Sequence, residues 1–195
     1  MAKPAGLLLA AGAGTRMGRP KALVRDEDGN SWLHRSIEVL RDGGCEPVIV
    51  VLGAGADQAR SLVPDGVEVV LADDWATGMA ASLRAGLSAA EATAADAVVV
   101  HLVDLPDVGA DVIDRVARSA SGAGRSALAR AAYDGVPGHP VVLGRAHWAA
   151  VAELAVGDSG ARPYLAAHDV EGIECGDLAR GRDVDQPPAN GGPLA

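Results

Sequence analysis

Short apolar runs alternate with longer amphipathic segments along most of this chain. Apolar runs without a polar face are typical of strands buried on both sides, as in a parallel sheet with helices on each face. The alternation therefore predicts an α/β fold with a mostly parallel sheet between two helical layers, α/β/α. The expected strands cover Gly6 to Ala11, Pro47 to Leu52, Val67 to Leu71, Ala97 to Val103 and Ala127 to Ala132.

The segments between these runs carry the spacing of amphipathic helices. In "SWLHRSIEVLRDGG" the apolar residues Leu33, Ile37 and Leu40 recur at i, i+4 and i+7. Ser31 is placed to cap this helix, and Gly43 ends it. Similar spacing predicts further helices at Met79 to Ala90, Ala110 to Ser119 and Arg145 to Leu154.

The chain of 195 residues is long enough for one sizeable hydrophobic core and has no composition shift that would separate two domains. We therefore expect a single domain over residues 1–195. From about residue 186 the sequence loses its periodicity and is rich in Pro and Gly, so we expect a frayed tail.

The charge balance bears on possible partners. Acidic side chains outnumber basic ones, 26 to 17, and the formal net charge is -9. Proteins that bind nucleic acid or an anionic membrane need a basic face, so neither partner is expected. No apolar run approaches the roughly 20 residues of a membrane-spanning helix.

The cysteines and the first apolar stretch bear on the compartment. Cys45 and Cys175 lack CxxC spacing and nearby histidine ligands, so we expect two free thiols in a reducing compartment and no structural zinc. The stretch from Ala5 to Gly14 resembles a short signal-peptide core, but its glycines and the run Leu7 to Leu9 fit a buried first strand better. The cytoplasm is the expected location.

The loops that follow the expected strands should meet, because ligands of open α/β sheets bind at the carboxyl ends of the strands. We expect the loops from Gly12, Gly53, Asp73 and Asp104 to converge there. Asp104 directly ends a strand, where a carboxylate can hold a cation that bridges phosphates. A helix cap is the alternative role for this residue.

The first loop, in "GLLLAAGAGTRMGRPKALV", suits an anion. Its glycines let backbone N–H groups approach phosphate oxygens, and Arg16 and Lys21 add positive charge. The loop lacks the GxxxxGK[ST] pattern of a P-loop, and its GxGxxxG spacing departs from the GxGxxG of dinucleotide-binding folds. A tight turn without a ligand stays open as the plain alternative.

The same loop carries a longer resemblance. The string Leu9-Ala10-Ala11-Gly12, Gly14, Arg16-Met17-Gly18 and Lys21 resembles the LAAGxGxRMGxxK signature of the MobA-like nucleotidyltransferases. The segments "WATGMAASLRAGL", "VVVHLVDLP" and "DVDQPPA" are similar to the family's GxxxSL, GDxP and DIDTPED motifs. "GHPVVLGR" and "GDSGARPYL" resemble segments of its molybdenum cofactor cytidylyltransferase branch, so the resemblance covers nearly the whole chain.

This resemblance implies a Rossmann-like fold and a nucleotidyltransferase. The enzyme would move CMP from CTP to the terminal phosphate of molybdopterin that carries its metal, with release of pyrophosphate. Mg²⁺ is the implied cofactor, with Mn²⁺ as a substitute, and a molybdoenzyme or its chaperone is the implied recipient. GTP, or another phosphorylated acceptor such as a sugar or isoprenoid phosphate, is the alternative within this class. The alternatives outside the nucleotidyltransferase class are an NAD(P)-dependent oxidoreductase and a non-catalytic nucleotide-binding module.

The resemblance also assigns residues to roles. Arg16, Lys21 and Asp104 match catalytic positions, because transfer between phosphates needs cations and a metal ligand. Asp104 and Asp185 match metal ligands, with Asp183 as the near alternative to Asp185. His139, in "GHP", is expected on the acceptor side.

The remaining matched positions surround the nucleotide, and two of them depart from the family pattern. Val103 stands where the motif usually has Gly, which affects close backbone approach. Ala80 stands where Ser is common, which removes one hydrogen bond to the base or ribose. The residues expected to bind the nucleotide are Leu9, Ala10, Ala11, Gly12, Gly14, Arg16, Lys21, Gly53, Gly78, Met79 and Ser82.

Overall fold

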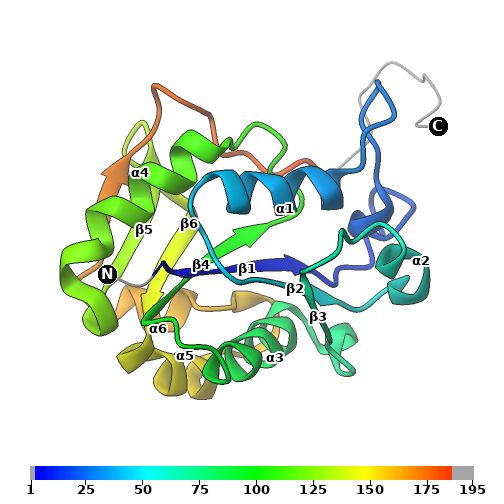
Figure 1. Cartoon of the computed structure of the whole chain (residues 1–195). Helices are drawn as coiled ribbons and strands as arrows, with labels where there is room; N and C mark the ends of the chain where they lie inside the picture. The colour runs from blue at the N-terminus through cyan, green and yellow to red at the C-terminus, as the bar shows by residue number, and fades with distance from the viewer. Residues whose placement is uncertain (1–2, 186–195) are drawn as a thin grey trace.

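The computed structural model describes residues 3–185, and the tail expected to fray from about residue 186 lies outside this range. Within it, seven strands form one sheet in the order β3-β2-β1-β4-β6-β5-β7 (Figure 1). Neighbouring strands run parallel, except that β6 is antiparallel to both β4 and β5. The strands are β1 (Ala5–Ala10), β2 (Val48–Leu52), β3 (Glu68–Leu71), β4 (Ala97–Leu102), β5 (Leu128–Tyr133), β6 (Val136–Gly144) and β7 (Glu171–Glu174).

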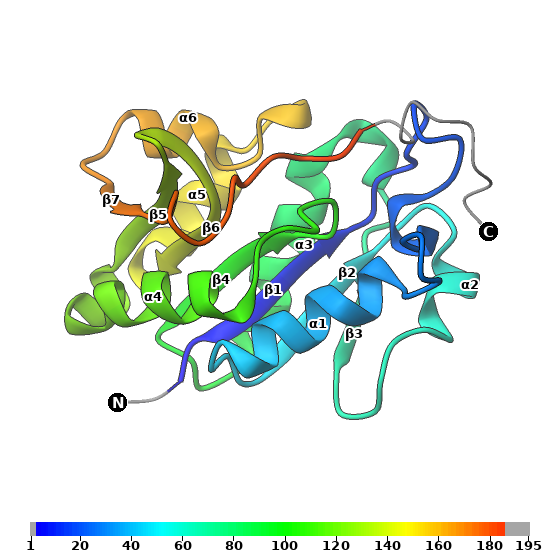
Figure 2. The ribbon, with the colours of Figure 1, turned by 90° about the horizontal axis from the view of Figure 1, so that it is seen from above.

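Helices cover both faces of the sheet (Figures 1 and 2). Helices α1 and α4 pack on one face, and α3, α5 and α6 on the other, each over its own apolar cluster. The expected three-layer α/β fold with a mostly parallel sheet is confirmed. The helices are α1 (Trp32–Asp42), α2 (Ala56–Arg60), α3 (Met79–Glu91), α4 (Ala110–Ala120), α5 (Trp148–Leu154) and α6 (Arg162–Ala166); 3₁₀ turns cover Lys21–Leu23, Trp75–Thr77, Ser121–Ser126, Arg145–His147 and Gly157–Ser159.

Strand β1 lies at the centre of the fold and is wholly buried. Leu8 pairs with Val50 of β2 on one side and with His101 of β4 on the other. Leu7 packs toward α3, whereas Leu8 packs toward α1 and α4. A strand with neighbours on both edges and helices on both faces has no side left for polar residues, which explains the sequence AGLLLA.

The five expected strands, and helices α3 and α4, begin and end within one residue of the predicted bounds. Helix α1 is capped as expected, because the Ser31 hydroxyl accepts a hydrogen bond from the His34 N–H at 3.3 Å. The helix expected at Arg145 to Leu154 instead opens with a 3₁₀ turn and becomes α-helical at Trp148. The expected bounds were therefore accurate wherever the periodicity was strong.

Two strands and two short helices were missed by the sequence analysis. In β6, prolines and a glycine interrupt the apolar run of "VPGHPVVLG". Its turn to β5 is a tight hairpin in which Asp134 and Gly135 have φ of +52° and +77°, and this Asp-Gly pair is a hairpin signal that was overlooked. Strand β7, EGIE, is mostly exposed, and α2 and α6 are only five residues long.

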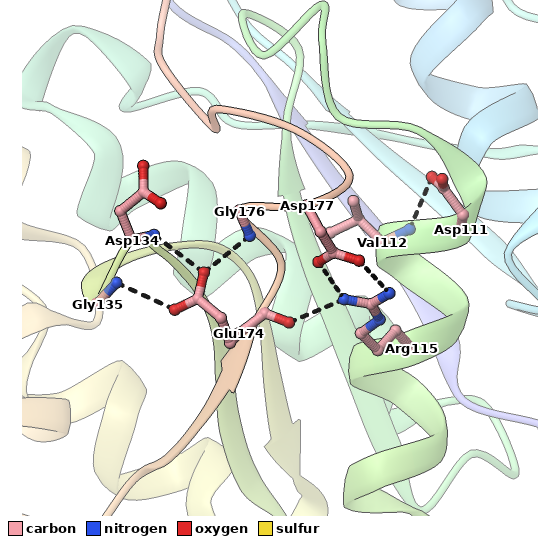
Figure 3. A network of polar contacts seen from close by, with 8 residues as sticks. All are labelled: Asp111, Val112, Arg115, Asp134, Gly135, Glu174, Gly176 and Asp177. Carbon is pink, nitrogen blue, oxygen red and sulfur yellow. Dashed lines mark hydrogen bonds and ion pairs between the residues drawn. The ribbon is translucent and has the colours of Figure 1, made fainter.

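A polar network holds the chain around the end of β7 (Figure 3). The Glu174 carboxylate accepts three backbone N–H hydrogen bonds, among them those of Asp134 and Gly135 at 2.9 and 3.0 Å. Arg115 of α4 forms two hydrogen bonds to the Asp177 carboxylate, at 2.6 and 2.9 Å. These contacts fix β7 and the residues after it against the β5–β6 hairpin and α4.

The tail then returns to the carboxyl end of β4. The Asp107 carboxylate accepts hydrogen bonds from the N–H groups of Arg180 and Gly181 at 2.8 and 3.1 Å. The Val184 N–H donates to the Asp104 carbonyl at 3.0 Å. Backbone hydrogen bonds therefore place the end of the described chain beside the loop that follows β4.

Both cysteines are buried free thiols, as expected. Burial raises the pKa of the Cys45 thiol to about 12. Across residues 3–185, none of the helices is both long enough and apolar enough to cross a membrane.

Gly86 determines how closely α3 approaches the sheet. A Cβ at this position would collide with Leu7 Cδ1 of β1 and would lie 3.0 Å from Val51 Cγ2 of β2. We expect Gly86→Val to lower the free energy of unfolding by about 1–3 kcal/mol, measured by urea titration, because overpacking displaces neighbouring side chains. Gly122→Val is the control, since a Cβ there meets no atom within 4 Å. Equal losses in the two variants would contradict the close packing of α3.

Candidate active site

Two adjoining cavities lie at the carboxyl ends of β1 and β4. The larger has a volume of about 700 Å³ and the smaller about 280 Å³. Lys21 and Asp104 line both cavities and therefore stand at their boundary. The other shared lining residues are Leu9, Met79, Leu102 and Asp158. Two cavities that meet at a charged pair are suited to bring two ligands together.

The loop after β1 presents a row of unused backbone donors. The N–H groups from Gly12 to Thr15 make no hydrogen bond to any residue of 3–185. The loop is closed instead through the Gly12 carbonyl, which accepts from the Lys21 N–H at 3.2 Å. Gly14 has φ of +58°, and the Arg19 carbonyl fills the place a Cβ would take. Consecutive free N–H groups of this kind form an anion-binding concavity.

The Lys21 ammonium connects three segments of the chain. It donates hydrogen bonds to Asp104, just after β4, and to Asp185 in the tail, the latter at 2.5 Å. Arg16 donates to the other oxygen of Asp185 at 2.8 Å. The side chains of Lys21 and Asp104 are only 19% and 11% exposed, whereas that of Arg16 is 71% exposed. The Lys21–Asp104 ion pair is therefore held by the surrounding packing, whereas the Arg16 side chain is exposed to solvent.

The same contacts shift two protonation equilibria. Burial opposes the charge of Lys21 and is the largest single influence, but hydrogen bonds and attraction from Asp104 and Asp185 together outweigh it and raise the pKa of Lys21. The hydrogen bond from Lys21, against the opposing effect of burial, lowers the pKa of Asp185, and Arg16 adds to that effect. At neutral pH the cluster therefore holds a charged ammonium and a charged Asp185.

Asp104, Asp183 and Asp185 together form a carboxylate cluster. One oxygen from each lies within 4.8 Å of the other two. Mg²⁺ and Mn²⁺ prefer oxygen ligands of this kind, so the cluster fits a divalent cation. The expected ligands Asp104 and Asp185 thus face the same point, the alternative Asp183 lies beside them, and Lys21 occupies one side of the cluster.

The smaller cavity lies between the loop after β1 and the start of α3. Ala11 and Trp75 close its inner wall, and Gly53 packs behind them: a Cβ on Gly53 would lie 2.6 Å from Trp75 Cβ and 2.8 Å from Ala11 Cβ. Ser82 is 5% exposed, and its hydroxyl makes no hydrogen bond within residues 3–185. This hydroxyl is therefore free to bind a polar edge of a ligand.

The larger cavity combines an apolar floor with charged side chains. His139 lines it, and burial, followed by repulsion from Arg130 and Arg162, lowers the pKa of His139 to about 4, so its imidazole is neutral at pH 7. The floor residues from β4 and β6 are Val100, Leu102, Val141 and Leu143; the lining cations are Arg16, Lys21, Arg130 and Arg162, and the carboxylates are Asp104, Asp158, Asp183 and Asp185.

Most of the sequence-predicted site residues line these cavities, namely Leu9, Ala11, Gly12, Arg16, Lys21, Gly78, Met79, Ser82, Asp104, His139 and Asp185. Three do not: Ala10 belongs to the core on the α1 side, Gly14 is enclosed by its own loop, and Gly53 lies behind Trp75. Asp73, from a loop expected to converge here, does not line either cavity. The roles given to all of these residues stay predictions.

Sequence reasoning did not single out four of the charged or aromatic residues that line the cavities: Trp75, Arg130, Asp158 and Arg162. Trp75 and Asp158 stand in the quoted segments "WATGM" and "GDSGAR", where nothing local separates them from surface residues. Arg130 had a visible signal, since it is the one charged residue in the strand-like run "ALARAAY". A charged side chain inside a buried strand needs a partner or a ligand.

Comparison with known proteins gives one family match and relatives of differing function. A family model described as a MobA-like NTP transferase domain matches residues 6–172. Nicotine blue oxidoreductase of Paenarthrobacter nicotinovorans is 36% identical over 189 residues, which covers 92% of this chain and 91% of that protein. A probable molybdenum cofactor guanylyltransferase of Opitutus terrae is 39% identical over 106 residues, which covers 54% of this chain and 50% of that protein.

Solved structures agree with this match. An Rv0371c homologue from Mycobacterium sp. strain JC1 is 31% identical with a TM-score of 0.80, covering 93% of this chain and 90% of that chain. A manganese complex of Rv0371c from Mycobacterium tuberculosis H37Rv is 27% identical with a TM-score of 0.73, covering 89% of both chains. The fold is therefore the expected Rossmann-like one, and this chain belongs to the MobA-like NTP transferase family.

Proposed function

We propose that this protein is a Mg²⁺-dependent nucleotidyltransferase that moves CMP from CTP to the terminal phosphate of molybdopterin carrying its metal. The observation that carries this proposal is the pair of cavities meeting at Lys21 and Asp104. CTP is assigned to the smaller cavity, with its triphosphate on the free N–H groups that start at Gly12. The phosphorylated acceptor is assigned to the larger one.

The reaction needs positioned charge more than acid or base groups. An oxygen of the acceptor phosphate attacks the α-phosphorus of CTP, the bond to the β-bridging oxygen breaks, and pyrophosphate leaves with that electron pair. Lys21 and Arg16 lie where they can balance the charge that grows on the phosphoryl and pyrophosphate oxygens. A divalent cation held by Asp104, Asp185 and Asp183 would neutralise phosphate charge when bound.

The choice of CTP rests on the smaller cavity and on the quoted cytidylyltransferase-like segments. The Ala11 methyl and Trp75 close the inner wall, which leaves less depth for a purine than a glycine at position 11 would. The free Ser82 hydroxyl is available to the base or ribose. The guanylyltransferase named among the relatives makes GTP the competing nucleotide.

A second candidate is an NAD(P)-dependent oxidoreductase. One relative that aligns along nearly the whole chain carries the name nicotine blue oxidoreductase, and this supports the candidate. Against this candidate, hydride transfer does not require the Lys21–Asp104 ion pair or the cluster of three carboxylates. NADPH is therefore included as a competing ligand in the experiment that follows.

Crossing four NTPs with a panel of phosphorylated acceptors that includes the molybdenum cofactor tests the proposed function. We expect pyrophosphate release only with an acceptor present and fastest with CTP. Calorimetry should give tighter binding of CTP with Mg²⁺ than of GTP with Mg²⁺ or of NADPH, and Ala11→Gly should narrow the gap between CTP and GTP. Tighter GTP binding would reject the cytidylyl assignment, and NADPH binding with no pyrophosphate release would favour the oxidoreductase.

The two expected metal ligands provide a second test. We expect Asp104→Asn and Asp185→Asn each to lower turnover by about two orders of magnitude with little change in fold, as for other lost transition-state contacts. The double variant should lose much less than the product of the two, because both carboxylates act on one cation. Circular dichroism controls for folding. Independent, multiplicative losses would argue against a shared ion.

Lys21 gives a third test that needs no turnover. Its ammonium shares Asp104 and Asp185 with any cation bound there, so removing the charge should strengthen binding of Mn²⁺ alone by about tenfold or more. Titration followed by electron paramagnetic resonance measures the affinity of Lys21→Met.

Lys3→Met is the matched control for Lys21→Met, because Lys3 has a comparable ion pair with Glu46 at 2.8 Å on the exposed surface. It should leave Mn²⁺ affinity unchanged. Unchanged affinity in Lys21→Met as well would remove the three carboxylates as the metal site.

A further inference from the structure

Arg130 lines the larger cavity without a polar partner among residues 3–185. Three of the four cations that line it have protein partners: Arg16 and Lys21 bind Asp185, and Arg162 donates to the Asp158 and Ser159 carbonyls at 2.9 and 3.3 Å. Arg130 makes no hydrogen bond or ion pair with any residue of 3–185, and its Nε atom is buried without an acceptor. An unsatisfied buried donor costs free energy, so this arrangement calls for a ligand.

Strand pairing places Arg130 on the same face of the sheet as the cavity floor. Arg130 of β5 pairs directly with Val141 of β6, and Val141 pairs with Val100 of β4, so the three side chains share one face of the sheet. The register of β5 and β6 shifts just after Arg130, and such irregularities redirect side chains. Arg130 therefore lies on the same face as the apolar floor, with its Nε buried and its charge unpaired among residues 3–185.

The same register separates Arg130 from the reacting phosphates. Asp104 is four residues beyond Val100 and two past the end of β4, which is at most about 13 Å of chain, and β5 lies two strands away from β4, about 10 Å across. The backbones of Arg130 and Asp104 are therefore well separated, although both side chains line the same cavity. A ligand that contacts both residues has to bridge the part of this separation that the two side chains do not cover, which favours an elongated molecule.

We propose that Arg130 binds a second negatively charged group of the acceptor, at the end opposite to the phosphate that reacts. The inference rests on the proposed function and extends it to the class of acceptor: a phosphorylated molecule with a separate anionic centre, such as the oxo-metal dithiolene of a molybdenum cofactor. His139 cannot replace Arg130 in this role, because its imidazole is neutral at pH 7. Arg162 is already committed to two carbonyls.

The unpaired state of Arg130 separates a binding role from a structural one. Removing a side chain that stabilises the fold lowers the melting temperature. Arg130 has no polar contact among residues 3–185, so its removal should not have this effect. We expect Arg130→Gln to melt at or above the temperature of the wild type. We also expect the KM for the acceptor to rise about 10- to 100-fold, with little change in kcat or in the KM for CTP, and Arg130→Lys to restore part of the loss.

A binding measurement tests the site without turnover. Molybdate, a small dianion, is titrated calorimetrically into protein saturated with CTP and Mg²⁺, so that the phosphate loop is occupied. We expect wild-type protein to bind molybdate and Arg130→Gln to bind it about tenfold or more weakly. Arg118→Gln is the control: it removes the same charge from an arginine on α4 that is paired with Asp114 at the surface.

The outcomes separate the two proposals. Loss of molybdate binding in Arg130→Gln but not in Arg118→Gln supports the anion site. This result would stand even if pyrophosphate release were never observed and the proposed function failed. Equal or undetectable molybdate binding by the wild type and Arg130→Gln would overturn the anion site. A lower melting temperature together with changes in both KM values would assign Arg130 a structural role instead.

Discussion

The Lys21 ammonium, held between Asp104 and Asp185, is the interaction on which the rest of this site depends. It joins the loop after β1, the end of β4 and the returning tail, three segments that are distant in the sequence. Removing one member of a largely buried ion pair leaves an uncompensated charge, so the three segments are energetically coupled. The tail reaches this point because Glu174 holds it to the β5–β6 hairpin and Asp107 accepts hydrogen bonds from its backbone. Leu178, Ala179 and Val184 also pack against the core on the α1 side.

The sheet divides into two halves with different tasks. The parallel half, β3-β2-β1-β4, brings strand ends and their loops to one edge, where free N–H groups and the start of α3 surround the smaller cavity. Strand β6 runs the other way and joins β5 through a hairpin, so it presents a strand face instead of a loop beside β4. That face supplies Val141 and Leu143 of the apolar floor and carries His139, and its hairpin partner β5 carries Arg130.

The local charge of the site differs from that of the whole chain. The formal net charge is -9, yet the larger cavity is lined by Arg16, Lys21, Arg130 and Arg162. An acidic surface disfavours nonspecific binding of polyanions, while cations inside a concave site still attract a small anionic ligand. Four carboxylates in the same cavity offset much of that positive charge, so a divalent cation can enter beside the lysine.

The sequence by itself determined the parallel core, because buried strands and amphipathic helices follow from hydrophobic periodicity, which is a local property. It also located the glycine loop and Asp104, which directly follow apolar runs, and Lys21, which the family resemblance singled out. Periodicity could not reveal β6, whose prolines and glycine hide a buried strand, or β7, whose polar residues suit an exposed edge. Only the tertiary structure decided that Asp183 joins the two expected ligands Asp104 and Asp185, that Trp75 lies beside Ala11, and that Arg130 lines a cavity without a partner among residues 3–185. Such contacts depend on strand register and on the path of the tail, and neither is encoded in the spacing of neighbouring residues.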